Sequence, residues 1–170
     1  MISDPPKAAP AALPEGRFSG RLEFAALVRQ ALDIAAAQGW REIIWCDPDF
    51  ADWPLGERVV VQALNDWSSS GRKLTLLAAN YDAVLGRHAR FVTWRRAWSH
   101  LVECRKTAVV SAISLPSALW SPVWMFERLD TDRCIGVASS DAARRVALKQ
   151  RLSECLLNSS AGFGASVLGL

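Results

Sequence analysis

The 170-residue sequence has no apolar stretch approaching the roughly 20 residues of a membrane span. Its first 16 residues contain no basic segment leading into an apolar run, so we expect no secretory signal and a reducing, cytoplasmic location. It also contains no G-x-G-x-x-G or G-x-x-x-x-G-K-S/T phosphate loop and no G-x-S-x-G nucleophile elbow. These absences argue against a membrane protein, the common nucleotide-binding enzymes and an α/β-hydrolase.

Side chains that bind metals or titrate near neutral pH are scarce. The only histidines are His88 and His100, for which structural roles are favoured over catalytic ones. Zinc sites usually contain close cysteine or histidine pairs, but the four cysteines are far apart: Cys46, Cys104, Cys134 and Cys155. We therefore expect no metal site and no cofactor, and we interpret the cysteines as small buried hydrophobes.

The composition is that of a globular protein, with 51% hydrophobic and 22% charged residues. Eight tryptophans predict a thick core, a partner surface or both. The net charge is only +3, but it is uneven. Residues 1–80 carry 8 Lys+Arg against 10 Asp+Glu, a balance of −2, and residues 81–170 carry 12 against 7, a balance of +5. The basic second half leaves nucleic-acid binding open as an alternative function.

The spacing of apolar residues predicts one α/β domain over residues 17–158. A Pro/Ala-rich arm, expected to be disordered, precedes it at residues 1–16, and a Gly/Ser-rich tail with an apolar end follows at 159–170. Helices are expected at 21–38 after a Ser19 cap, at 54–68, at 81–98, and from a Ser139 or Ser140 cap to 157. Strands are expected at 41–46, 74–78, 100–104, 123–129 and 134–138, and residues 107–113 fit either a strand or a buried loop. This order predicts three layers, with a mostly parallel or mixed sheet flanked by helices.

An acidic loop with Asp47, Asp49 and Asp52 follows the first predicted strand. Ligands of parallel α/β sheets bind beyond the carboxyl ends of the strands, so these residues are candidate ligand-binding residues. Three carboxylates could hold Mg²⁺ and make a cryptic metal-dependent enzyme. Asp-Pro-Asp is also ordinary turn chemistry, which we favour because no phosphate-binding loop accompanies it. His100 and Asp130 are further candidate ligand-binding residues.

The segment Leu129–Ser140, LDTDRCIGVASS, resembles part of the phospholipase D-like superfamily. In that superfamily an Asp-containing turn leads to a strand that ends in a small-residue G-S-x-N run. Asp130 and Asp132 match the acidic turn, and the small residues Gly136, Ser139 and Ser140 loosely match the end of the run. With the order of elements, the resemblance covers residues 21–158 and implies one phospholipase D-like half. The sequence is also similar to proteobacterial domains of that layout, sometimes attached to acetyltransferases.

The superfamily's catalytic signature, H-x-K-x-x-x-x-D, is missing in both possible registers. Its Asp placed on Asp130 puts Val123 and Met125 at the His and Lys positions. Its Asp placed on Asp132 puts Met125 and Glu127 there. That chemistry needs one histidine to attack phosphorus and another to protonate the leaving group. The resemblance therefore implies a non-catalytic binding or regulatory module, and we expect no enzymatic activity.

In the superfamily that the sequence resembles, enzymes made of one half pair two active faces in a dimer. The resemblance therefore implies a homodimer. Trp120, Trp124 and Phe126 could form the interface, and they could equally be core. Phe163 and Leu168 in the tail are further interface candidates, and the tail could equally fray. A protein partner or a nucleic acid stays open, and a membrane is not expected.

Overall fold

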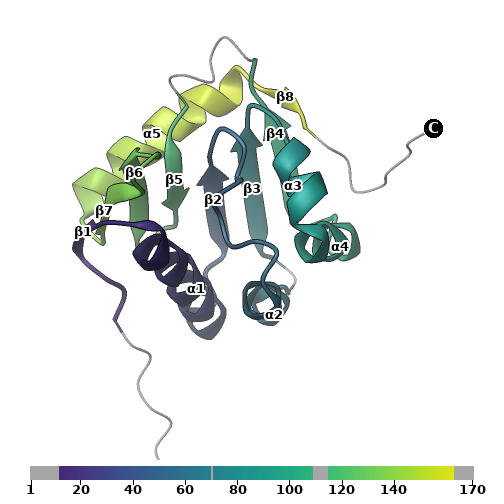
Figure 1. Cartoon of the computed structure of the whole chain (residues 1–170), viewed down its shortest axis with the longest axis horizontal. Helices are drawn as coiled ribbons and strands as arrows, with labels where there is room; N and C mark the ends of the chain where they lie inside the picture. Colours follow the sequence, from purple (N-terminus) through teal and green to yellow (C-terminus); the bar gives the residue numbers. More distant parts are fainter. Residues whose placement is uncertain (1–11, 70, 109–114, 163–170) are drawn as a thin grey trace, which may run out of the picture.

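The structure is a computed structural model that describes residues 12–69, 71–108 and 115–162. The described strands are β1 (Gly16–Phe18), β2 (Glu42–Cys46), β3 (Lys73–Ala78), β4 (Val102–Lys106), β5 (Ser117–Trp120), β6 (Met125–Asp130), β7 (Ile135–Ser139) and β8 (Ser160–Ala161). They form a single eight-stranded sheet in the order β1-β7-β6-β5-β2-β3-β4-β8 (Figure 1). No helix within the described ranges is long and apolar enough to cross a bilayer.

The sheet is mixed. Strands β2, β3 and β4 run parallel, with Ile43 opposite Leu74 and Leu76 opposite Cys104. The other pairings are antiparallel, including β5 against β2 and β6 against β5. The β5–β6–β7 meander therefore extends the parallel strands on the β2 side, where it brings residues from the second half of the chain beside the loop that follows β2.

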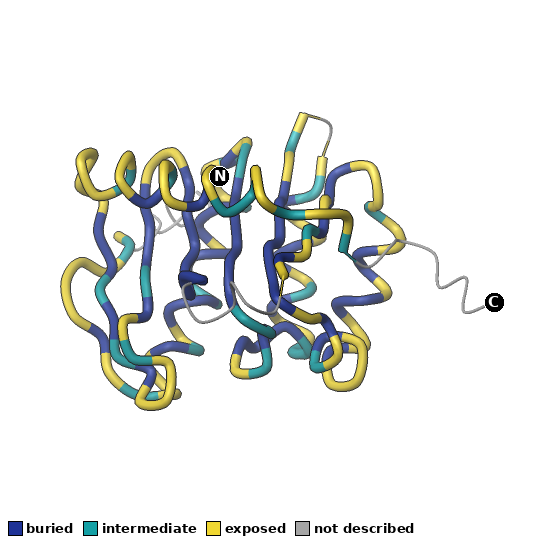
Figure 2. The backbone as a smooth tube through the Cα atoms, turned by 90° about the horizontal axis from the view of Figure 1, so that it is seen from above, coloured by how far each residue is buried: buried dark blue, intermediate teal, exposed yellow. Residues whose placement is uncertain are grey.

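Helices cover both faces of the sheet unequally. Four helices pack on one face: α1 (Arg21–Gln38), α2 (Arg58–Trp67), α3 (Asp82–Arg87) and α4 (Ala89–Ala97). The other face carries α5 (Ala142–Leu157), and Figures 1 and 2 show the sheet between these layers. The predicted three-layer α/β fold with a mixed sheet is confirmed.

The protein has one apolar cluster on each face of the sheet, and the alternation of side chains along β2 contributes to both. Ile43 and Trp45 point into the larger apolar cluster beneath α1–α4, and Ile44 and Cys46 point into the smaller cluster beneath α5. Successive side chains of a strand face opposite sides of its sheet, so a central strand covered on both faces is apolar throughout. The buried strands form the dark centre of Figure 2.

The helix predicted over 81–98 is two helices separated at His88. This residue has φ −116° and ψ 51°, outside helical geometry. Its ring is buried, and Nε2 lies 3.0 Å from the carbonyl oxygen of Phe50. The break lets the ring reach this carbonyl, an interaction that periodicity along the sequence cannot reveal. Arg95, which lies in α4, is also buried.

The predicted start of α1 at Arg21 is confirmed, but its predicted cap is wrong, and α2 and α5 begin later than predicted. Gly20, with φ 92°, precedes α1, while Ser19 provides no side-chain cap and donates its N–H to Glu23. Helix α2 begins four residues after Pro54, because Pro54 accepts the N–H of Glu57 in a preceding turn. Asp141, and neither preceding serine, caps α5 by accepting the N–H of Arg144 at 3.0 Å.

The short strands β1, β5 and β8 were not predicted. The carbonyl of Pro14 accepts a hydrogen bond from the Trp124 indole, so ordered contacts extend into the arm that we expected to end at residue 16. Cys134 precedes β7 and does not belong to it. Most of the ambiguous segment 107–113 lies outside the described residues.

Candidate functional site

A polar cleft of about 310 Å³ lies at the carboxyl end of β2. The loop after β2, the end of β6 and the turn before β7 meet there, and the first turn of α1 closes one side. The lining residues are Arg21, Asp47, Pro48, Asp49, Ala51, Asp52, Arg128, Thr131 and Asp132. The cleft therefore forms where the sequence predicted a ligand site, and it contains all three aspartates of the acidic loop.

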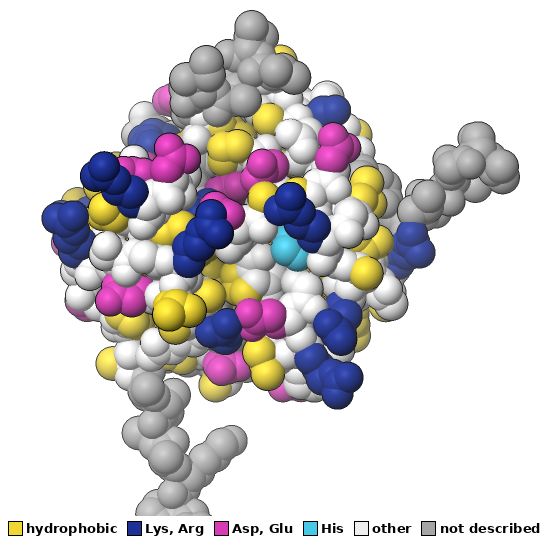
Figure 3. Space-filling model, viewed as in Figure 1, with side chains coloured by type: hydrophobic (Ala, Val, Ile, Leu, Met, Phe, Trp, Pro, Cys, Tyr) yellow, Lys and Arg dark blue, Asp and Glu magenta, His cyan; other side chains and the backbone are white. Residues whose placement is uncertain are grey.

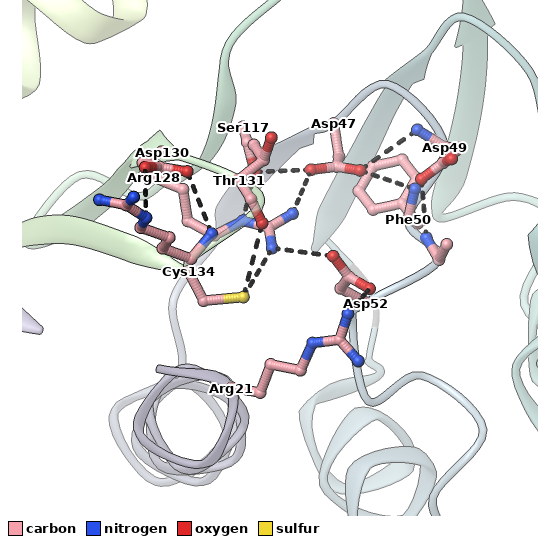
Figure 4. A network of polar contacts seen from close by, with 12 residues as sticks. Arg21, Asp47, Asp49, Phe50, Asp52, Ser117, Arg128, Asp130, Thr131 and Cys134 are labelled. Atoms are coloured by element: carbon pink, nitrogen blue, oxygen red, sulfur yellow. Dashed lines mark hydrogen bonds and ion pairs between the residues drawn. The ribbon is translucent and has the colours of Figure 1, made fainter. Parts of the chain in front are cut away.

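The cleft is built around a buried ion pair between Asp47 and Arg128. Both side chains are 2% exposed, and Nη2 of Arg128 lies 2.8 Å from Oδ1 of Asp47 (Figure 4). The Ser117 hydroxyl donates to the same Oδ1 at 2.6 Å and accepts a hydrogen bond from Arg128 Nε at 2.8 Å. Three strands thus contribute to one contact, since Asp47 follows β2, Ser117 begins β5 and Arg128 lies in β6.

The second oxygen of Asp47 holds its own loop. Oδ2 accepts the backbone N–H of Phe50 at 2.8 Å and that of Asp49 at 3.2 Å. The Asp-Pro-Asp segment therefore forms the turn that its residues favour. Asp47 receives four hydrogen bonds in total, which occupies the acceptor capacity of both carboxylate oxygens.

The guanidinium of Arg128 is engaged to a similar extent. Nη1 lies 3.4 Å from Asp52 Oδ2 and 3.4 Å from Cys134 Sγ, and the central carbon is 4.3 Å from the centre of the Phe24 ring. Burial acts to lower the pKa of Arg128, but the charge and hydrogen bond of Asp47 outweigh it and raise that pKa above its ordinary value. Arg128 therefore stays positively charged in the folded protein, and its charge is directed at Asp47.

Two residues with positive φ border this pair. Phe50 has φ 57° and Cys134 has φ 51°, a region that residues other than glycine seldom occupy. Phe50 is held through its N–H to Asp47, and the carbonyl of Cys134 accepts the N–H of Gly20 at 3.1 Å. Such conformations persist where surrounding contacts over-determine them. Asp47 supplies one such contact to Phe50 and Arg128 supplies one to the Cys134 thiol, so the pair contributes to holding both loops of the cleft.

The rim of the cleft is less constrained. The Asp52 side chain is 33% exposed and lies 4.0 Å from Nη2 of Arg21. Asp49 accepts the N–H of Ala51, and Asp132 makes no hydrogen bond or ion pair with the described residues. Within residues 12–69, 71–108 and 115–162, no group of three His, Cys, Asp or Glu side chains is placed to hold a metal ion.

Two predicted ligand residues lie away from the cleft lining. His100 is exposed in the turn before β4, at the opposite edge of the sheet, with its ring 5.8 Å from that of Trp98. Asp130 ends β6 and accepts the N–H of Arg133 at 3.0 Å. Neither faces Asp47, so the structure does not assemble the five predicted ligand residues into one site.

The candidate interface residues Trp120, Trp124 and Phe126 are buried within the single chain. They belong to the core, which was the alternative that the sequence left open. Phe163 and Leu168 lie outside the described residues.

Sequence reasoning missed Arg128 and Ser117, the partners of Asp47. One signal was available: Arg128 occurs two residues after Phe126 in a run that is otherwise mostly apolar, so both side chains share the core face of β6. Charged residues at core positions are rare unless they are paired.

Comparisons with known proteins identify a shared fold and no family. No protein-family model matches the sequence, and no curated protein matches it. Among solved structures, the chain is similar to TrmBL2, an archaeal chromatin protein described as showing a novel mode of DNA binding, with a TM-score of 0.57 and 12% identity. The match covers 88% of this chain and 54% of that one, so this chain spans about half of its length. At this identity the likeness establishes the α/β fold alone.

Proposed function

We propose that this protein is a non-catalytic binding module. The observation that carries the proposal is the saturation of the Asp47–Arg128 pair. A general base must accept a proton and a metal ligand must offer a lone pair, but the oxygens of Asp47 already accept four hydrogen bonds. The pair holds the loops of the cleft in place, and the exposed rim residues are the groups available to a ligand.

The phospholipase D-like layout remains part of this proposal. Met125, which replaces a signature residue in either register, is buried in the apolar cluster beneath α5. Glu127 binds Arg151 of α5 at 2.7 Å, and Val123 lies in the turn between β5 and β6. The positions that would carry a nucleophile and a phosphate-binding cation therefore point away from the polar cleft or lie outside it, which supports a module without this chemistry.

The test is hydrolysis of a chromogenic phosphodiester, with and without Mg²⁺. We expect no turnover above buffer. A bound Mg²⁺ ion would stabilise the folded state and raise the unfolding temperature, so we expect Mg²⁺ to leave this temperature unchanged. Turnover that disappears in an Asp130→Ala variant would overturn the proposal. A rise in unfolding temperature with Mg²⁺ that Asp49→Asn abolishes would support a metal-dependent site at the acidic loop instead.

Self-association is a further part of the proposal. Because the aromatic segment around β5 and β6 is buried, residues 163–170 are the remaining candidate from the sequence. Light scattering on the full chain and on a chain ending at Gly162 tests this. We expect a dimer that the truncation weakens, and a monomeric full-length chain would contradict it.

A second candidate function is nucleic-acid association. One observation favours it: residues 83–102 contain no aspartate or glutamate and carry three exposed arginines, Arg87, Arg90 and Arg96. The similarity in fold to a DNA-binding chromatin protein is consistent with it. Since phosphate contacts release counterions, true binding must weaken steeply as salt rises. Fluorescence anisotropy of a labelled DNA duplex over a salt series tests it, and no binding at low salt would exclude it.

A further inference from the structure

A second hollow of about 430 Å³ lies between α2 and α4, which lie on the same face of the sheet (Figure 1). Helix α2 contributes Arg58, Val61, Gln62 and Asn65, and α4 contributes Arg90, Thr93, Trp94 and Ala97. We call this hollow the α2–α4 groove. Its lining contains two arginines, two amides and a hydroxyl, and it contains no carboxylate.

Several donors in the α2–α4 groove are available. The side chains of Arg58 and Asn65 make no hydrogen bond or ion pair with the described residues. Arg90 donates one N–H to the carbonyl of Gly56 at 2.9 Å, which holds its guanidinium near the start of α2. The two arginines therefore lie at one end of the groove with unused N–H groups, and of the two it is Arg90 that the Gly56 carbonyl holds in place.

The positive charge near the groove is local to α4 and the residues beside it. Over the face seen in Figure 3, basic and acidic side chains are interspersed, so the molecule offers no broad basic surface there. The carboxylate-free stretch of residues 83–102 includes all of α4, and Arg87 and Arg96 are exposed on it. On α2, the exposed carboxylate of Asp66 accepts the Gln62 amide at 3.0 Å. Helix α4 has no carboxylate of its own, so a negatively charged partner would meet attraction along α4.

We propose that the α2–α4 groove binds the sugar–phosphate backbone of duplex DNA. This inference rests on the nucleic-acid function proposed above and names its site. Arginine, asparagine, glutamine and threonine are side chains that commonly contact phosphate oxygens, and arginine can engage a phosphate with two N–H groups. The apolar side chains Val61 and Ala97 match the less polar deoxyribose rings.

The lining favours a duplex over a single strand. Proteins that bind single strands stack unpaired bases on aromatic side chains. The aromatic residue in the groove, Trp94, is 3% exposed and directs its indole N–H to the Ser68 hydroxyl at 3.2 Å. Trp94 therefore offers no face to an unpaired base, whereas backbone contacts need none.

The experiment compares three full-length proteins for binding to one labelled duplex over a salt series: the natural chain, Arg58→Gln/Arg90→Gln and Arg133→Gln/Arg144→Gln. Both variants lose two exposed positive charges, but neither Arg133 nor Arg144 lines the groove. Each lost phosphate contact lowers the slope of log affinity against log salt by about 0.9. We therefore expect the groove variant to lose about 1.8 from the slope and the control to keep it. Unfolding temperatures check that all three proteins are folded.

The outcomes separate the inference from the function on which it rests. Salt-dependent binding with the same slope in the groove variant, or with an equal loss in the control, would overturn the groove and leave DNA binding standing. No binding by the natural chain would overturn both. Tighter binding of the single strand than of its duplex would contradict the duplex assignment. Binding of poly-glutamate without binding of DNA would assign the groove to an acidic peptide instead.

Discussion

The polar cleft at the carboxyl end of β2 and the α2–α4 groove differ in whether their charged side chains already bind each other. This difference matters more than which charges line each hollow. The cleft is lined by four aspartates and two arginines, but its buried members bind each other. The groove is lined by two arginines and has no carboxylate. The first arrangement stabilises the fold, and the second leaves donors for a partner. Four predictions test this contrast, from the largest expected effect to the smallest.

The first prediction is that Arg128→Met destabilises the protein strongly. The variant leaves Asp47 buried without its counter-charge, and losing one partner of a buried pair costs about 3–5 kcal/mol. Chemical denaturation measures the free energy of unfolding. Arg133→Met, at a side chain 78% exposed, is the control and should change it by less than about 0.5 kcal/mol. A loss below about 1 kcal/mol for Arg128→Met would mean that the pair does not stabilise the cleft.

The second prediction concerns coupling within the same pair. Asp47→Leu removes the acceptor of Arg128, and the double variant Asp47→Leu/Arg128→Met removes both charges. Directly bonded partners couple by about 0.5–3 kcal/mol, so the double variant should lose less stability than the two single losses added together. Additive losses in the same denaturation assay would show that the two residues act independently.

The third prediction compares a tightly packed glycine beside the cleft with a glycine that has open space around it. Gly136 lies opposite Arg128 in the sheet, and a Cβ there would be 2.2 Å from the Glu127 carbonyl oxygen. Gly136→Ala should therefore cost about 1–3 kcal/mol, as overpacking does. A Cβ added at Gly86 of α3 would meet no other atom within 4 Å, and Gly86→Ala should be neutral or stabilise by up to about 1 kcal/mol. Equal unfolding temperatures for the two variants would contradict this difference.

The smallest effect is expected at the partly exposed pair of Arg29 and Glu57, whose shortest contact is 2.6 Å. The hydrogen bond from Arg29 lowers the pKa of Glu57. A depressed folded pKa gives stability that is complete above the unfolded value of about 4.3 and is lost as pH falls through the folded value. Solvent screening limits the gain to about 0.5 kcal/mol. The natural chain should therefore exceed Glu57→Gln slightly at pH 7 and lose that advantage in acid, and a gap that grows in acid would contradict the assignment.

The part of the fold that could be predicted is the part with local signals. The apolar run of β2 and the spacing along α1 and α5 gave these elements nearly correct bounds, and Gly39, a residue type that favours helix ends, ends α1 in the left-handed conformation. The broken helix at His88 escaped prediction because its cause is a contact with Phe50, 38 residues earlier. Short β5 escaped because four residues give too little periodicity to distinguish a strand from a loop.

Only part of the candidate site could be predicted, because some of its residues have local signals and others come together through long-range strand pairing. Asp47 and Asp49 could be found from the loop that follows β2, since the end of a strand and a turn are local features. Arg128 is 81 residues away and reaches Asp47 only because β5 pairs with β2 and β6 with β5. The core-facing position of Arg128 in β6 could be read locally, but its partner could not, because the partner depends on how the strands are arranged.

The two ends of the sheet have a consequence for how the protein avoids polymerising. The outermost strands are β1, with three residues, and β8, with two. Short edge strands present few unpaired backbone groups to another chain and so discourage edge-to-edge aggregation. Because β1 pairs with β7, a fragment starting at Arg21 would uncover the five-residue edge of β7. In the same way, β8 covers part of β4, so both short strands shield the edge of a longer strand from pairing with another chain.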